Sequence, residues 1–180
     1  MKIWASVCVF LWGSVCSATP LTWLTARTAD IVNSCTIVGV NGTTLYTPDA
    51  SHSYGAQWTR DFAYALMFAP QLVNASTISP AVRATFLGQR DDGCMPDRVQ
   101  SNGVAVYSPG GASSPFADHA WDNMPFSALL LSAAARHLQS EPLFCDLEPA
   151  ARRALDFVNR STAGLVFNDV AKPNCTYGGW

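Results

Sequence analysis

Apolar residues recur at helical spacing between residues 58 and 69. Phe62, Leu66 and Ala69 fall on one face of a helix in this segment. Pro70 then ends the pattern, because proline lacks the backbone N–H that an inner helical position needs. We therefore expect a helix over residues 58–69 with one face toward a core.

A second helix is expected to begin at Ser79. Serine is a favoured N-cap residue, and Pro80 follows at the first helical position, where a missing N–H is tolerated. Val82, Phe86 and Leu87 would form the inner side of this helix.

Two further helices follow a long polar segment. Residues 126–138 are almost free of charge, which indicates a helix buried on most sides, capped by Asp122 or Asn123. Asp146 would cap the last helix. The inner stripe of that helix is expected to contain Leu147, Ala151, Ala154, Leu155 and Val158.

The remaining segments carry weaker patterns. Residues 19–53 look irregular, apart from one candidate hairpin in which residues 36–40 and 43–46 flank an Asn41-Gly42 turn. Residues 90–111 are polar and rich in turn residues, and long structureless connections in compact domains are usually functional. Helices at this spacing pair as antiparallel hairpins, so we expect an all-α fold whose third helix belongs to the inner layer of an α/α toroid.

The composition narrows the range of functions. Hydrophobic residues make up 49% of the chain, which excludes an intrinsically disordered protein. The net charge is −2, and no basic cluster exceeds the pair Arg152–Arg153, which argues against binding to nucleic acid or to an acidic membrane surface. Only Glu141 and Glu148 are glutamates, so carboxylate chemistry in this chain would be aspartate chemistry.

The N-terminus resembles a secretory signal peptide. Lys2 supplies a positive charge, residues 3–15 are apolar but too few to span a bilayer, and small residues precede a cleavage site after Ala18. An uncleaved membrane anchor is the alternative. We expect residues 1–18 to be the signal peptide, residues 19–53 an irregular or short-hairpin segment, and residues 54–180 the main domain, with no membrane contact after cleavage.

Sequons and cysteines also favour the secretory pathway. Four Asn-x-Ser/Thr sequons lack proline in the middle and are candidate glycan acceptors: Asn41, Asn74, Asn159 and Asn174. Outside the signal, an even number of cysteines fits up to two disulfides with three alternative pairings: Cys35, Cys94, Cys145 and Cys175. Their spacing matches no zinc motif, so no metal and no cofactor is expected.

The first candidate for chemistry is the segment Trp58-Thr59-Arg60-Asp61. Arginine offers a fixed fork of donors and aspartate offers acceptors, so Arg60 and Asp61 together suit neighbouring sugar hydroxyls. Trp58 would stack on the apolar face of a sugar ring. The alternative is a buried Arg–Asp pair that only ties the start of a helix to its loop.

The second candidate lies at a loop-to-helix junction. Asp122 follows Trp121, and partial burial beside an aromatic ring favours the protonated form that a general acid needs. The alternative role is plain N-capping by Asp122 or Asn123. His119 with Asp118 resembles a base with its orienting carboxylate, but the sequence offers no nucleophile for a triad.

The third candidate is the acidic loop 91–98, which contains Asp97. Its carboxylates do not follow the spacing of a calcium-binding loop, so a sugar contact or a solvated loop is favoured over a metal site.

Together these motifs resemble the six-hairpin, (α/α)6-barrel glycosidase superfamily. The resemblance rests on the segments 58–64, 93–97 and 120–126, in this order. It implies that Arg60 and Asp61 bind the terminal sugar. It also implies that Asp122 is the general acid in a Trp-Asp-Asn turn like that of trehalases and glucosidase I-like enzymes. Trp58, Asp97, His119, Trp121 and Asn123 would then contact the substrate.

The chain departs from that superfamily in two respects. His119-Ala120 stands where Ser-Gly is usual before the Trp-Asp turn, and only four helices are visible where the barrel has twelve. We therefore expect a partial (α/α)6 toroid, with the second catalytic carboxylate beyond Trp180 and no activity in this chain alone. The expected function is that of a secreted, inverting exo-glycosidase. The alternatives are a carbohydrate-binding pseudoenzyme and a small disulfide-stapled interaction module.

Overall fold

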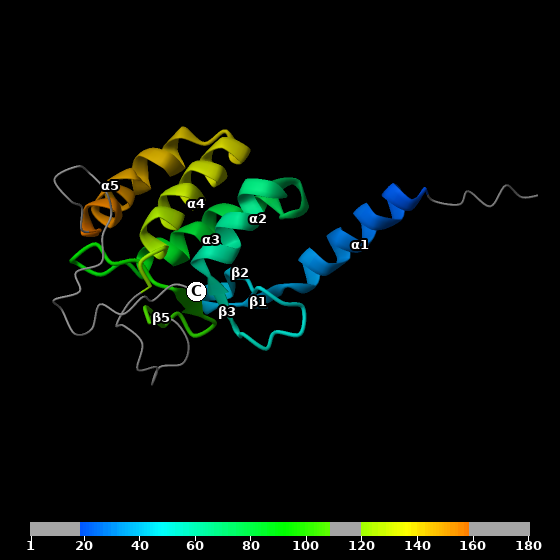
Figure 1. Ribbon diagram of the computed structural model, residues 1–180, viewed down its shortest axis with the longest axis horizontal. Helices are drawn as coiled ribbons and strands as arrows, with labels where there is room; N and C mark the ends of the chain where they lie inside the picture. The colour runs from blue at the N-terminus through cyan, green and yellow to red at the C-terminus, as the bar shows by residue number, and fades with distance from the viewer. Residues whose placement is uncertain (1–18, 109–119, 159–180) are drawn as a thin grey trace, which may run out of the picture.

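A computed structural model of the protein describes residues 19–108 and 120–158. Four helices pack together into the body of the molecule: α2 (Thr59–Phe68), α3 (Ala75–Leu87), α4 (Asn123–Leu138) and α5 (Glu141–Phe157). Short strands lie at one end of these helices, and helix α1 (Pro20–Ser34) projects away from them (Figure 1). None of the helices in the described residues combines the length and apolar character that crossing a membrane requires.

Helix α4 is the centre of the helical core. It packs against both α2 and α5, and its side chains Met124, Leu130, Leu131 and Ala134 are buried. An almost uncharged helix is stable only when most of its surface is covered, which explains its place between two neighbours. The core continues into α2 through Phe62.

The candidate hairpin is confirmed. Strands β1 (Thr36–Val38) and β2 (Thr44–Tyr46) pair antiparallel, and the 3₁₀ turn η1 (Val40–Gly42) joins them. Asn41 adopts a left-handed conformation in that turn, with φ of 56°, which asparagine tolerates better than most residues.

The expected all-α partial toroid is wrong, because the structure contains a second sheet. Strands β3 (Ala56–Trp58), β4 (Arg98–Gln100) and β5 (Ala105–Val106) form an antiparallel sheet in the order β3-β4-β5. Two of these strands come from the segment that we expected to be a structureless loop. Strands of two or three residues are too short to display the alternation by which a strand is recognised in a sequence. The fold is therefore mixed, with helices on two small antiparallel sheets.

The boundaries of two helices also differ from expectation. Helix α3 begins after Asn74, whose side chain accepts a hydrogen bond from Ser76 N, and Pro80 lies inside the helix. Helix α5 begins after the N-cap Ser140 rather than at Asp146. The residues before Ser79 carry little apolar periodicity, so the first turn of α3 was not visible in the sequence.

Helix α1 is a further departure from the irregular segment expected over residues 19–53. Thr19 caps it and Pro20 begins it, a standard start for a helix. No residue of α1 is buried, and its apolar residues Leu21, Trp23, Leu24 and Ile31 are exposed.

Gln57 joins both sheets to the helical body. Its side chain is fully buried and accepts a hydrogen bond from Tyr46 N at 3.1 Å. Its amide donates to Ala81 O at 3.0 Å and to Thr85 Oγ1 at 2.9 Å. Because Tyr46 lies in β2 and Gln57 in β3, this one amide fixes the strands against α3.

Candidate functional site

The start of helix α2 is tied to the loop that precedes β4. The backbone N–H of Thr59 donates to Asp97 O at 2.9 Å, and its hydroxyl donates to Pro96 O at 2.7 Å. Thr59 is fully buried, so these bonds are shielded from water. They place Arg60 and Asp61, in the first turn of α2, beside Asp97.

Arg60 connects this region to the start of helix α4. Its Nη1 donates to Asp122 Oδ2 at 2.6 Å, although 62 residues separate the two in sequence. The side chains are 12% and 25% exposed, respectively, so the ion pair lies at the edge of the core. The first and second candidate motifs thus meet in one place.

A second ion pair lies deeper in the same cluster. Arg98 Nη1 lies 2.9 Å from Asp97 Oδ2. The side chain of Asp97 is 2% exposed and that of Arg98 is 9% exposed. The guanidinium of Arg98 also stacks over the ring of Trp58, 4.8 Å from its centroid, and donates to Ser108 O at 3.2 Å. Arg98 therefore covers one face of Trp58, which restricts the expected sugar stacking to the other face.

Burial changes the acidity of two carboxyl groups in the cluster. Desolvation raises the pKa of Asp97 to about 6, and this effect outweighs the opposing influence of its bond to Arg98 and of the charges of Arg98 and Arg60. Desolvation also raises the pKa of Asp61, partly offset by the positive charge of Arg60. The negative charge of Asp122 adds to both increases. With a pKa of about 6, Asp97 binds its proton more tightly than an ordinary aspartate does.

Several buried polar atoms of the cluster have no hydrogen-bond partner among the residues that the structure describes. They are Asp122 Oδ1, both side-chain polar atoms of Asn123, and Trp58 Nε1. A buried polar group without a partner is destabilising by about 1–3 kcal/mol, so such groups are rare outside functional sites. The amide of Asn123 is fully buried and offers one acceptor and two donors.

The alternative of plain N-capping finds no support in the geometry. Asp122 occupies the N-cap position of α4, but its side chain makes no capping hydrogen bond. Trp121 precedes it and packs against Phe157 at the end of α5, with ring centroids 6.2 Å apart. His119 and Asp118 lie outside the described residues.

Sequence reasoning missed Arg98. The acidic loop drew attention to its carboxylates, whereas Arg98 contacts Asp97, Trp58 and Ser108 together. No local pattern marks Arg98 in the sequence, because its position follows from the pairing of β4 with β3, which sets Arg98 opposite Trp58.

The predicted glycosylation sites and cysteines lie away from this cluster or outside the described residues. Asn41 and Asn74 are exposed, whereas Asn159 and Asn174 lie outside the described residues. No disulfide joins Cys35, Cys94 and Cys145 to one another, and Cys175 is outside the described part, so the disulfide framework stays a prediction. Within residues 19–108 and 120–158, no three His, Cys, Asp or Glu side chains gather as metal ligands would.

Comparison of the chain with models of protein families, with curated proteins and with solved structures finds no match. The glycosidase resemblance therefore stays a prediction that depends on the motifs and on the geometry of their cluster.

Proposed function

We propose that this protein is a secreted glycoside hydrolase that carries a sugar clamp and a general acid. The observation that carries the proposal is the 2.6 Å contact between Arg60 and Asp122. It unites the two motifs to which the resemblance assigns substrate binding and proton transfer. A structural ion pair explains the contact itself, but not the unpartnered polar atoms beside it.

The clamp would consist of Arg60 and Asp61. Guanidinium and carboxylate groups side by side match the donor and acceptor sets of adjacent sugar hydroxyls. Asp122 Oδ1, which has no hydrogen-bond partner among the described residues, would gain one from a bound sugar.

Asp122 would donate the proton to the glycosidic oxygen. Sugar hydroxyls that accept from Arg60 would compete with Asp122 for the guanidinium and free its carboxyl group to face the glycosidic oxygen. The proton passes to the oxygen as the bond to the anomeric carbon breaks, and the leaving alcohol departs neutral. In an inverting enzyme, a second carboxylate about 6.5–9.5 Å away removes a proton from the attacking water.

Secretion is part of the proposal. Its support is the N-terminal signal pattern and the four sequons, two of which lie on exposed positions of the described structure. A chain with only 13% charged residues would also gain solubility from attached glycans.

A saccharide-binding assay tests the proposal without depending on turnover. The chain, secreted by a eukaryotic host, is titrated with a panel of mono- and oligosaccharides and observed by NMR. We expect at least one saccharide to bind, and Arg60→Met to weaken its binding. Arg27→Met, on the exposed surface of α1, is the matched control. Absence of binding across the panel, or binding that is insensitive to Arg60, would contradict the proposal.

A protein that only binds carbohydrate is the second candidate. The observation that favours it is the occupation of two carboxylates by ion pairs, Asp122 with Arg60 and Asp97 with Arg98. Such a protein would bind the same saccharides without releasing a reducing sugar. A reducing-end assay on the saccharide that binds best distinguishes the two functions.

A further inference from the structure

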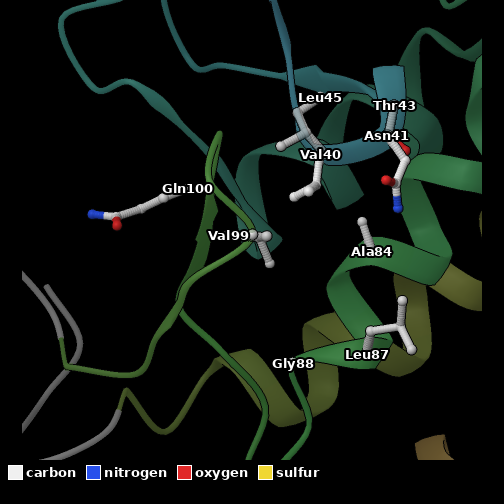
Figure 2. A pocket seen from close by; sticks show the side chains of 10 residues that line it. Val40, Asn41, Thr43, Leu45, Ala84, Leu87, Gly88, Val99 and Gln100 are labelled. Atoms are coloured by element: carbon white, nitrogen blue, oxygen red, sulfur yellow. The ribbon is translucent and has the colours of Figure 1, made fainter.

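A hollow lies away from the aspartate cluster, between the η1 turn, the end of α3 and strand β4 (Figure 2). Its volume is about 300 Å³. Leu45 and Val99, at its base, are buried, whereas Leu87, at its rim, is 86% exposed. The expectation that Leu87 belongs to the inner side of its helix is therefore wrong. The hollow thus has two exposed apolar side chains at its rim, because Val40 beside Leu87 is half exposed.

The turn that carries Asn41 overhangs this hollow. Figure 2 shows the amide of Asn41 directed from the η1 turn toward α3, over Ala84. The residue is exposed. Asn41, Gly42 and Thr43 form a sequon, and Thr43 also lines the hollow.

We propose that Asn41 carries an N-linked glycan whose first sugar lies in this hollow. The proposal rests on the secretion proposed above, but not on the activity of the aspartate cluster. The new bond joins Asn41 Nδ2 to the anomeric carbon of an oligosaccharide carried on a lipid pyrophosphate. The pyrophosphate leaves with the bonding electrons, and the amide nitrogen loses one proton to the transferring enzyme.

The hollow has the size and chemistry for a sugar ring. Its volume lies at the lower end of the range of about 300–1,000 Å³ for small-molecule sites, as one or two rings require. The C–H face of the ring would cover Val40 and Leu87, which removes apolar surface from water.

The sequon at Asn74 differs in its surroundings. The Oδ1 atom of Asn74 accepts from Ser76 N at 3.1 Å and from Ser76 Oγ at 2.9 Å, so its side chain caps α3. Asn74 does not line the hollow. A glycan at Asn74 is therefore expected to extend into solvent, and its removal should leave stability unchanged.

Occupancy is tested first. The chain is secreted by a eukaryotic host, and the peptide containing Asn41 is analysed by mass spectrometry. We expect it to carry the mass of an N-glycan. An unmodified Asn41 in the secreted protein would overturn the proposal.

The position of the sugar is tested by two variants of Thr43. Thr43→Val keeps the shape of the side chain but destroys the sequon, whereas Thr43→Ser keeps the sequon. We expect the Val variant to melt about 2–4 °C lower than the Ser variant, the shift that a loss of about 1 kcal/mol causes in a chain of this size. The Val variant should also bind more of an apolar fluorescent dye. Asn74→Asp removes the sequon at Asn74 while it preserves the helix cap, and it should leave both readouts unchanged.

Enzymatic trimming locates the effect within the glycan. An endoglycosidase that leaves the first sugar on Asn41 should preserve the melting temperature and the low dye binding. Complete removal by an amidase should reproduce the Thr43→Val result. A glycan that points into solvent would give equal melting temperatures and dye binding for the two Thr43 variants, and that outcome would overturn the placement of the sugar.

Discussion

Arg60 in helix α2 and Asp122 at the start of helix α4 are joined by a 2.6 Å ion pair across 62 residues of sequence. The contact brings the Trp58–Asp61 motif and the Trp121–Asn123 motif into one cluster. The sequence alone does not show that these two motifs are neighbours. It also gives Arg60 a carboxylate partner other than its neighbour Asp61. The two aspartates can therefore be tested independently.

Asp122→Asn should slow hydrolysis by about 10²–10⁴-fold on a glycoside with a poor leaving group, in an enzyme that contains this chain. Asparagine keeps the size of the side chain but cannot donate a proton to the leaving oxygen. The loss should be much smaller on the matching glycosyl fluoride, whose departure needs little protonation. Rates on both substrates check this prediction. Equal losses would mean that Asp122 positions the sugar rather than protonating it.

Asp61→Asn should weaken saccharide binding more than tenfold, or by over about 1.4 kcal/mol, with little change in melting temperature. The small thermal effect is expected because the ion pair described for Arg60 is with Asp122, so Arg60 stays paired in this variant. Titration calorimetry and thermal unfolding give the two readouts. The exposed Asp156→Asn serves as control. A large drop in melting temperature with unchanged affinity would assign Asp61 a structural role.

Asp97 should make the protein less stable as the pH rises from about 4 to about 6. Its pKa is about 6 in the folded state against an ordinary value of 3.8, so the folded state binds the proton more tightly. The stabilisation is fully present below pH 3.8, and it is lost as the pH rises through 6. Its size is on the order of 3 kcal/mol.

Denaturant unfolding at several pH values, compared with Asp97→Asn, measures this contribution. The free energy of unfolding of the wild-type chain should fall relative to the variant over that interval. A difference that stays constant with pH would show that Asp97 titrates at its ordinary pKa.

Gln57→Leu should lower the free energy of unfolding by about 1–3 kcal/mol, because the buried N–H of Tyr46 loses its acceptor. The gain in apolar side-chain volume cannot replace that hydrogen bond. Urea unfolding of this variant and of Gln71→Leu, at an exposed position, provides the comparison. Equal stabilities would show that the amide does not hold the sheets to α3.

The helices that the sequence revealed best are those with a strong apolar pattern and a sharp boundary. The segment 58–69 contains α2 because Pro70 fixes its end, and α4 covers the almost uncharged segment 126–138. The second sheet was missed because its strands depend on partners far away in sequence. Trp58 pairs with Arg98 across 40 residues, a relationship that no local pattern contains.

The candidate site was predictable in its residue types but not in its pairing. A local reading of Arg60-Asp61 suggested that the neighbours pair with each other, whereas the fold supplies Asp122 as the partner. The same holds for Arg98, whose position over Trp58 follows from strand register. A sequence shows which charged residues are neighbours along the chain. The packing of one helix against another decides which of them form an ion pair.

Helix α1 begins two residues after Ala18, so the proposed cleavage of the signal peptide would affect the stability of this helix. Cleavage after Ala18 would create an α-ammonium group on Thr19, at the positive end of the helix dipole, and no acidic residue lies in the first turn to offset it. Isolated helices of about 12–15 residues are already marginal in water, and α1 buries none of its side chains. Removal of the signal peptide would thus favour unwinding of α1 from its N-terminal turn, and the mature protein would begin with a flexible segment.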